Sequence, residues 1–273
     1  MLKLMYITND PEIAKISANA GVDRIFVDME VLGKAERQGH LDSVKSHHVP
    51  QDIRKIRDAI GNKAQILARI NPMNPNTKDE VQAAIDNGAD IIMLPMWKTA
   101  KEVEDFCRFV DARAITMPLL ETKEADAALS EVLSLRCADE IYIGLNDLHL
   151  SYGQRFMFEL LADGTVERLS RQLCEAKMPF GFGGVGRPGG GMLPANYILG
   201  EHYRLGSQCV ILSRQFCNAA LDHDTVRTTL TDGICEVRTK EREFANWDKN
   251  DYLENQEKVK QCVQRIVDGM KQQ

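Results

Sequence analysis

The sequence lacks the features that would place the protein in a membrane or outside the cell. No stretch approaches the roughly 20 consecutive apolar residues that a membrane-spanning helix needs. The first residues, MLKLMYITND, show no basic region followed by a long apolar core, so they do not match a secretory signal peptide. From these absences we expect a cytoplasmic protein that does not associate with membranes.

The chain also lacks a basic excess and any close pair of cysteines. It has 34 Lys and Arg against 40 Asp and Glu, a formal net charge of −6, whereas non-specific nucleic-acid binding needs a basic face. The seven cysteines are scattered without a CxxC pair, and most lie in apolar runs, so we expect no metal site built from cysteines. The composition excludes a histone-like binder and a small secreted domain.

No Pro- or Ser-rich linker and no internal repeat divides the 273 residues. Instead, short apolar runs alternate with stretches of helical spacing along the chain. Most runs are solidly apolar, as parallel strands covered on both faces should be. The predicted strands are 2–8, 24–30, 64–71, 90–95, 114–121, 140–145, 180–186 and 208–213. The predicted helices are 11–20, 50–60, 77–87, 99–110, 122–135, 155–177 and 194–205.

Eight strands that alternate with helices in one unbroken series predict an α/β fold, a (β/α)8 TIM barrel. A doubly wound open sheet is the alternative, because a single sequence does not give the order of the strands. We expect residues 1–222 to form the barrel and residues 223–273 to form an extra C-terminal helical tail. We expect this tail to pack on a neighbouring subunit of a homo-oligomer, a trimer or hexamer, with a helix folded back on its own barrel as the alternative.

Charged residues gather at the carboxyl ends of the predicted strands, where a barrel places its active site. The second strand ends in Asp28 and Glu30, the third in Arg69 and the fifth in Glu121, and Asp147 follows the sixth. Because a buried charge must be paired or must ligate a metal, we expect these side chains to face one pocket.

Glu121 and Asp147 are candidates for an oxygen-only site that binds Mg²⁺ or a similar hard cation. The structural alternative is that each carboxylate caps the helix that follows it. The guanidinium of Arg69 must meet a carboxylate, which is supplied either by Asp28 or Glu30 or by a substrate. The residues alone leave both questions open.

Five segments carry a resemblance to a known barrel family. VDMEVLGK, ARINP, GADIIMLPM, PLLET and IGLNDLHLSYG follow one another in the order and spacing of that family. The chain resembles the metal-dependent, pyruvate-handling barrels that comprise the 4-hydroxy-2-oxoheptanedioate aldolases and the citrate lyase beta subunits. The resemblance covers residues 20–155 well and the last two strands loosely.

The resemblance implies a carbon–carbon lyase of the class II aldolase type, which acts on a 2-oxo acid and an aldehyde. It implies that Glu121 and Asp147 ligate a divalent metal, Mg²⁺ or else Mn²⁺ or Co²⁺. It also implies that Arg69 neutralises the oxo-acid carboxylate or enolate oxygen, and that the amides around Gly144, Asn146 and Asp147 hold the carboxylate. The alternatives are a malyl-CoA or citramalyl-CoA type of lyase, and a non-catalytic barrel that binds a metal and an oxo acid.

The chain departs from the family at the general base. In the aldolases the second strand ends in Asp-x-Glu-His, and the histidine is the acid/base, whereas this chain has Val31 at the histidine position. The citrate lyase pattern matches only in part. Substitute bases lie in the long segment 31–49, namely Lys34, His40, His47 and His48, and His149 is a further candidate. The candidate catalytic residues are therefore Arg69, His40, His48, Asp28 and Glu30.

The segment GFGGVGRPGGG (181–191) packs seven glycines into eleven residues after the start of the seventh strand. TIM barrels often bind phosphate in this region, because glycines let backbone N–H groups approach oxygens closely. Arg187 and Arg214 would supply positive charge, which would make the second substrate a phosphorylated aldehyde. The alternative is a lid without a ligand.

Overall fold

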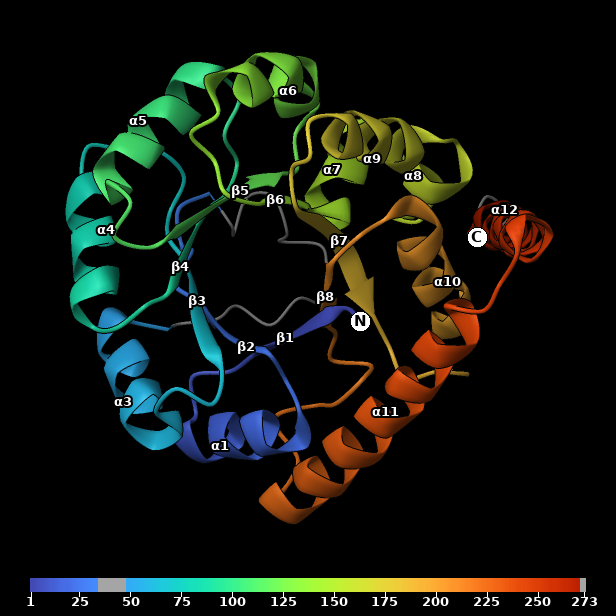
Figure 1. Ribbon diagram of the computed structural model, residues 1–273, viewed down its shortest axis with the longest axis horizontal. Coiled ribbons are helices and arrows are strands. Elements are labelled where there is room, and N and C mark those ends of the chain that lie inside the picture. The colour runs from blue at the N-terminus through green and yellow to red at the C-terminus, as the bar shows by residue number, and fades with distance from the viewer. Residues whose placement is uncertain (34–47, 271–273) are drawn as a thin grey trace.

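The computed structural model describes residues 1–33 and 48–270. Within these residues eight parallel strands close into a barrel in chain order, with β8 beside β1, and Figure 1 looks down its axis. The strands are β1 (Lys3–Ile7), β2 (Arg24–Asp28), β3 (Gln65–Arg69), β4 (Ile91–Leu94), β5 (Ile115–Leu120), β6 (Ile141–Ile143), β7 (Phe180–Val185) and β8 (Cys209–Leu212). The predicted TIM barrel is confirmed, and the open sheet is excluded.

Helices cover the outside of the barrel between successive strands (Figure 1). They begin where the sequence places capping residues; for example, Thr99 accepts a hydrogen bond from the Glu102 N–H at the start of α5. The helices that follow strands are α1 (Pro11–Ala20), α3 (Pro50–Ile60), α4 (Thr77–Asp86), α5 (Ala100–Val110), α6 (Lys123–Leu135), α7 (Leu145–Ser151), α8 (Glu159–Ala162), α9 (Thr165–Glu175), α10 (Ala195–Leu205) and α11 (His223–Phe244).

The single helix predicted over 155–177 is wrong. The structure has two helices there, α8 and α9, and they are separated by Gly164 in the left-handed conformation with φ +87°. Glycine adopts this conformation without strain, so the chain turns between Asp163 and Thr165 instead of continuing one helix. The short α7 lies outside the predicted helix ranges, and it begins at Leu145, the last residue of the predicted sixth strand.

The interior of the barrel is packed rather than open. Its apolar layer consists of Met5, Phe26, Leu67, Ile91, Met93, Met117, Leu119, Tyr142 and Cys209. At the amino end of the strands, the fully buried Arg24 donates two hydrogen bonds to the carboxylate of Glu140, with lengths of 2.8 and 2.6 Å. The apolar layer separates this ion pair from the carboxyl ends of the strands, where the predicted site lies.

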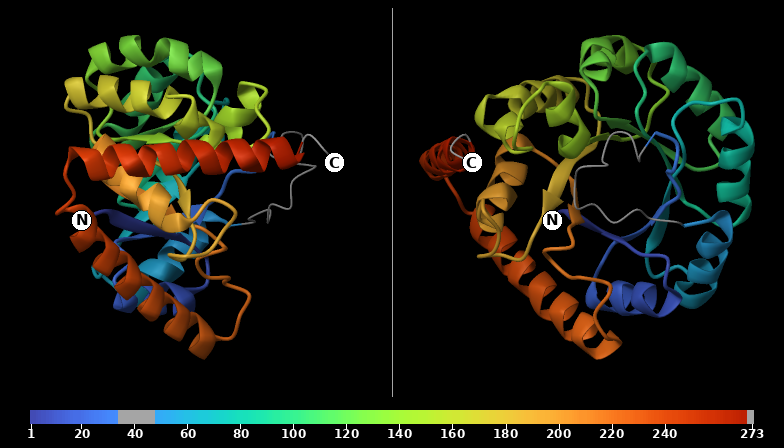
Figure 2. Two further views of the ribbon diagram at one scale, coloured as in Figure 1. Left: turned by 90° about the vertical axis from the view of Figure 1, so that its right-hand side faces the viewer. Right: turned by 180° about the vertical axis from the view of Figure 1, so that it is seen from behind.

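The C-terminal helices divide into one that belongs to the barrel and one that is extra. Helix α11 packs on α1 and α10 and so covers the seam between β8 and β1. Helix α12 (Lys249–Met270) lies outside α8 and α10 of its own chain, as Figure 2 shows in red. The tail thus packs on its own barrel. Its contact with a neighbouring subunit and the homo-oligomer stay predictions.

A polar anchor explains why α12 folds back. The buried side chain of Asn255 donates hydrogen bonds to the Tyr197 carbonyl at 3.0 Å and to Glu201 Oε1 at 2.9 Å, both on α10. Val259 and Val263 of α12 are buried beyond it. In the part of the chain that the structure describes, no helix is long and apolar enough to cross a membrane.

Candidate active site

The polar strand ends that the sequence singled out meet at the carboxyl end of the barrel. Asp28 is the last residue of β2 and Arg69 the last of β3, and the parallel register pairs these two positions directly. Glu30 and Glu121 follow β2 and β5, and Asp147 lies in the first turn of α7. All four carboxylate residues are at most 8% exposed. Four acidic groups and one guanidinium therefore share a buried layer.

The guanidinium of Arg69 is held by two carboxylates of its own chain. Its Nε donates to Asp28 Oδ1 at 2.8 Å and its Nη2 to Asp28 Oδ2 at 2.9 Å, and Nη2 also lies 3.3 Å from Glu30 Oε2. This bidentate geometry fixes the orientation of the guanidinium plane. Arg69 thus meets carboxylates of the chain itself, whereas a contact with substrate stays a prediction.

The charge of Arg69 is permanent in this setting. Burial works to lower its pKa, but the carboxylates of Asp28 and Glu30, and then that of Glu121, raise it above the ordinary arginine value. In the described part of the chain, the hydrogen bonds and ion pairs of Arg69 come from Nε and Nη2. Arg69 is therefore a fixed cation whose Nε and Nη2 atoms contact the carboxylates of Asp28 and Glu30.

Glu121 is positioned by two features of the backbone. Its Oε1 accepts a hydrogen bond of 3.0 Å from the N–H of Met96, a residue in the left-handed region with φ +54°. A Cβ atom at Gly144 would lie 2.9 Å from both the Cβ and the Oε2 of Glu121, so only glycine fits there. A strained residue and an obligatory glycine therefore hold this carboxylate from two sides.

The helix-capping alternative is wrong for Glu121, and Asp147 does not take the capping position. The N-cap of α6 is Thr122, whose hydroxyl accepts the Ala125 N–H at 3.0 Å. The N-cap of α7 is Gly144, and Asp147 lies inside the first turn. Neither carboxylate is therefore the N-cap residue of a helix.

The electrostatics of Glu121 reveal an excess of negative charge. Burial is the main factor that raises its pKa, and the neighbouring carboxylates of Asp147 and Glu30 raise it further, against the opposing charge of Arg69. Two carboxylates that repel each other in a buried layer are typical of a site for a hard cation.

The donor set fits such a cation through two protein ligands. The described residues contain no cluster of three or more His, Cys, Asp and Glu side chains arranged for a metal ion. Magnesium, however, keeps several waters and uses one or two carboxylates together with substrate oxygens. Glu121 and Asp147 match this sparse coordination, and they do not match a closed zinc-type site.

The structure limits what His48 can do. Its Nδ1 accepts a hydrogen bond of 2.9 Å from the backbone N–H of Asp28. Because an amide N–H can only donate, Nδ1 carries a lone pair and the neutral ring is protonated at Nε2. In this arrangement the imidazole has no lone pair at Nε2 with which to accept a proton. His48 lies beside the site as predicted, yet its geometry does not suit a general base.

Of the other predicted bases, only His149 lies among the described residues. His149 is buried within α7, where its Nδ1 contacts the Leu145 carbonyl of the same helix at 3.1 Å. Lys34, His40 and His47 lie outside the described residues. Val31, at the position of the aldolase histidine, is 52% exposed, and its N–H donates to Asn71 Oδ1 at 2.9 Å.

Gly144 and Asn146 lie at the start of α7, beside Asp147. Gly144 is the N-cap residue, and the side chain of Asn146 is exposed. The predicted carboxylate-holding amides are thus placed at the carboxyl end of β6, directly after the strand.

The first part of the glycine-rich segment lies in a strand, as predicted. Its first five residues, 181–185, belong to strand β7. A Cβ atom at Gly181 would lie 2.3 Å from the Cys209 carbonyl oxygen, so this glycine allows two strands to pack closely. Arg187 pairs with Glu236 of α11 at 2.7 Å, and the exposed Arg214 follows β8. The contact of these two residues with a phosphate stays a prediction.

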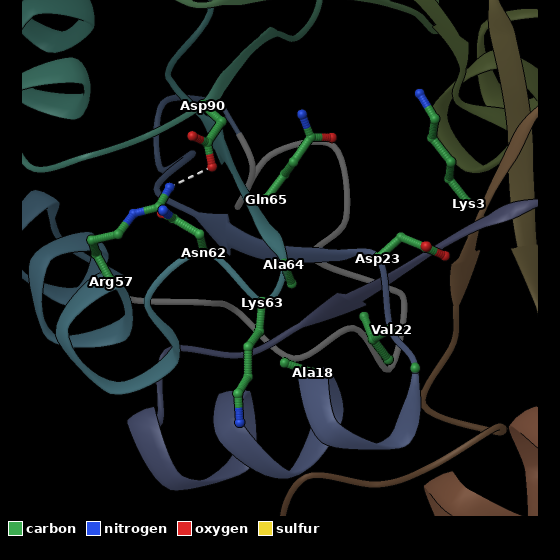
Figure 3. A pocket seen from close by; sticks show the side chains of 11 residues that line it. Lys3, Ala18, Val22, Asp23, Arg57, Asn62, Lys63, Ala64, Gln65 and Asp90 are labelled. Atoms are coloured by element: carbon green, nitrogen blue, oxygen red, sulfur yellow. Dashed lines mark hydrogen bonds and ion pairs between the residues drawn. The ribbon is translucent and has the colours of Figure 1, made fainter.

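A polar pocket of about 520 Å³ lies at the opposite end of the barrel (Figure 3). Its lining includes Lys3, Asp23 and Gln65, from the amino ends of strands β1 to β3, and the side chains of Arg57 and Asp90 point toward each other across one side. Because barrel enzymes bind substrate at the carboxyl ends of the strands, this pocket is not the candidate active site.

The sequence patterns do not predict the role of Met96. It lies in the segment GADIIMLPM, but its left-handed backbone and its amide contact with Glu121 depend on the tertiary fold. The next residue, Trp97, is fully buried, and its carbonyl accepts a hydrogen bond from the Thr122 hydroxyl at 3.1 Å. The β4–α5 connection thus orients the end of β5.

The sequence model of one family, HpcH/HpaI aldolase/citrate lyase, matches residues 3–156. The match covers more than half of the chain and includes Asp28, Arg69, Glu121 and Asp147. The protein belongs to the HpcH/HpaI aldolase/citrate lyase family. Membership places the chain among carbon–carbon lyases of the aldolase and citrate lyase kind, and it confirms the resemblance that the five sequence segments indicated.

Solved structures share this fold. An HpcH/HpaI aldolase from Desulfitobacterium hafniense DCB-2 is 18% identical, with a TM-score of 0.60 over 87% of this chain and 93% of that chain. A family protein from Burkholderia cenocepacia J2315 is 14% identical, with a TM-score of 0.61 over 78% and 87%. A variant of the citrate synthase SbnG is 14% identical, with a TM-score of 0.58 over 87% and 94%. Among curated proteins none matches this sequence.

Proposed function

We propose that this family member is a divalent-metal-dependent lyase of the class II aldolase type. Its substrates would be a 2-oxo acid, with pyruvate as the simplest, and an aldehyde. The observation that carries the proposal is the buried carboxylate pair of Glu121 and Asp147 beside the fixed cation Arg69.

Glu121 and Asp147 would hold the cation, which we expect to be Mg²⁺, Mn²⁺ or Co²⁺. When bound, such an ion supplies a Lewis acid that polarises the 2-oxo group of the substrate. The chain holds Glu121 Oε1 through the Met96 amide, which leaves Oε2 on the side of Gly144. The fixed orientation of this carboxylate means that the site needs little rearrangement when it is filled.

Arg69 would stabilise the negative charge that develops on the substrate oxygens as the carbon–carbon bond forms or breaks. Its plane is set by Asp28 before substrate arrives, so the charge needs no reorganisation during the reaction. The amides at the start of α7, from Gly144 to Asp147, would bind the carboxylate of the oxo acid.

The exchange of pyruvate methyl protons with D₂O tests the proposal without knowledge of the aldehyde. We expect the protein to accelerate this exchange when Mg²⁺, Mn²⁺ or Co²⁺ is supplied and to lose the acceleration when the cation is removed by a chelator, as followed by ¹H NMR. Exchange that is equally fast with and without a divalent cation would exclude a metal-dependent enzyme. Cleavage assays with malyl-CoA, citramalyl-CoA and free 4-hydroxy-2-oxo acids then separate the two lyase alternatives.

Of the two histidines predicted to be catalytic, we propose His40 for the acid/base role, because the Asp28 amide occupies Nδ1 of His48 and leaves Nε2 protonated. His40→Ala is expected to slow proton exchange about 100-fold, the lower range for loss of a general base. His48→Ala is the matched control and should slow exchange by less than about tenfold. The measurement is the exchange rate at saturating pyruvate, and a larger loss in His48→Ala than in His40→Ala would reverse the assignment.

A further inference from the structure

Two thiols lie together in a surface pocket away from the candidate active site. Cys107 is on α5 and Cys137 follows the end of α6 by two residues. Both line a pocket of about 510 Å³, together with the charged residues Lys101, Glu104, Arg108 and Asp111. The pocket gives small solutes access to a pair of sulfur atoms that belong to different elements.

The two thiols interact with each other and share a neighbour on β5. The side chain of Cys137 raises the pKa of the Cys107 thiol, and the side chain of Thr116 lowers it. The Thr116 hydroxyl lies 3.4 Å from the Cys137 carbonyl and donates to Asp139 Oδ2 at 2.7 Å. Both cysteines therefore lie beside the start of β5.

The accessibilities of the two sulfur atoms differ. Cys107 is only 9% exposed, whereas Cys137 is partly exposed. Burial is the main cause that raises the pKa of the Cys107 thiol, and the hydrogen bond and charge of Cys137 raise it further. Cys107 thus stays protonated, and a solute meets Cys137 first.

We propose that Cys107 and Cys137 form a redox-convertible thiol pair that hydrogen peroxide closes to an intramolecular disulfide. In the first step the Cys137 sulfur attacks the O–O bond, which breaks, and Cys137 becomes a sulfenic acid with release of one water. In the second step the Cys107 sulfur attacks the sulfenic sulfur, the S–O bond breaks, and the oxygen leaves as a second water. The two thiols lose two protons and two electrons, and the peroxide is reduced to two waters.

The disulfide would stabilise the barrel and not block its site. Thr116 and Cys137 lie at the amino ends of β5 and β6, whereas Glu121 and Asp147 follow the carboxyl ends of the same strands. The bond would close a loop that contains β5 and α6, and a cross-link of this length restricts the unfolded chain. We expect the oxidised protein to melt several degrees higher than the reduced protein.

Mass spectrometry of the full-length protein tests the proposal. After treatment with hydrogen peroxide, alkylation and non-reducing digestion, we expect one linked peptide that contains Cys107 and Cys137 and is two hydrogens lighter than the separate peptides. Dithiothreitol should reverse the link and the rise in melting temperature. The exposed Cys174 and Cys235 serve as internal controls for the strength of the oxidant.

Single substitutions define the order of the steps. In Cys107→Ser, the sulfenic acid of Cys137 should persist and react with dimedone, and the melting temperature should not rise on oxidation. In Cys137→Ser, Cys107 should stay open to alkylation after unfolding. The proposal is overturned if Cys107 and Cys137 remain separate thiols after peroxide has modified Cys174 and Cys235, or if either links to another cysteine.

Discussion

Glu121→Gln is expected to slow the metal-dependent exchange of pyruvate methyl protons about 1000-fold, because the variant loses one of two anionic groups proposed to hold the cation. Glutamine keeps the shape of the side chain, and its amide oxygen can still accept the N–H of Met96. The measurement is the initial exchange rate in D₂O as a function of Mg²⁺ concentration. Glu124→Gln is the matched control, since the same change is made three residues away on an exposed position of α6.

The stability of this variant gives a readout that is independent of activity. Because burial and then Asp147 raise the pKa of Glu121, the folded protein binds a proton there more tightly than the unfolded chain. The contribution of Glu121 to the stability of the metal-free wild type is therefore fully present below the ordinary glutamate pKa and is lost as the pH rises through the folded value. We expect the stability of Glu121→Gln not to fall in this pH range.

The activity measurement has its own contradicting outcome. An exchange rate of Glu121→Gln within twofold of wild type at saturating Mg²⁺ would refute the metal-ligand role.

Arg69→Lys is expected to lower kcat/KM for pyruvate exchange between about 100- and 1000-fold. Lysine keeps the positive charge but has no planar fork, so it loses the paired contacts with the two oxygens of Asp28 and cannot be oriented by them. The buried carboxylates of Asp28 and Glu30 are then less well compensated, and stability also falls. Exchange kinetics and urea denaturation measure the two effects separately.

The control for Arg69→Lys is the same change at the opposite end of the barrel. Arg57 also pairs with a carboxylate, that of Asp90, but it lines the pocket at the amino ends of the strands. Arg57→Lys should cost some stability and leave the exchange rate unchanged. If both variants lose activity in proportion to their stability, Arg69 has no special role in the reaction.

Much of the fold follows from local sequence patterns. Helices α1 and α3 begin and end at the predicted residues, because proline starts each of them and a glycine follows each. The apolar runs place every strand to within a few residues, since strands that are covered on both faces must be apolar throughout. The sequence pattern does not predict the interruption at Gly164 between α8 and α9, because the helical spacing continues on both sides of this glycine.

The site could be predicted only in part, and the reason is long-range geometry. The sequence identified which charged residues follow the strands, but the pairing of Arg69 with Asp28 depends on the register between β2 and β3. The amide of Met96 reaches Glu121 through a left-handed conformation that no residue type signals. Arg187 pairs with Glu236 because α11 passes beside it, a contact 49 residues apart in sequence.

The apolar layer inside the barrel has a consequence for how this protein can change. It separates the Arg24–Glu140 ion pair from the reacting end, so the two ends can be altered independently. Buried ion pairs can often be replaced by well-packed hydrophobic residues at no cost in stability. Substitutions at the amino ends of the strands can therefore raise the stability of the barrel without altering the candidate site. The added stability would offset destabilising substitutions at the carboxyl ends that a new substrate requires.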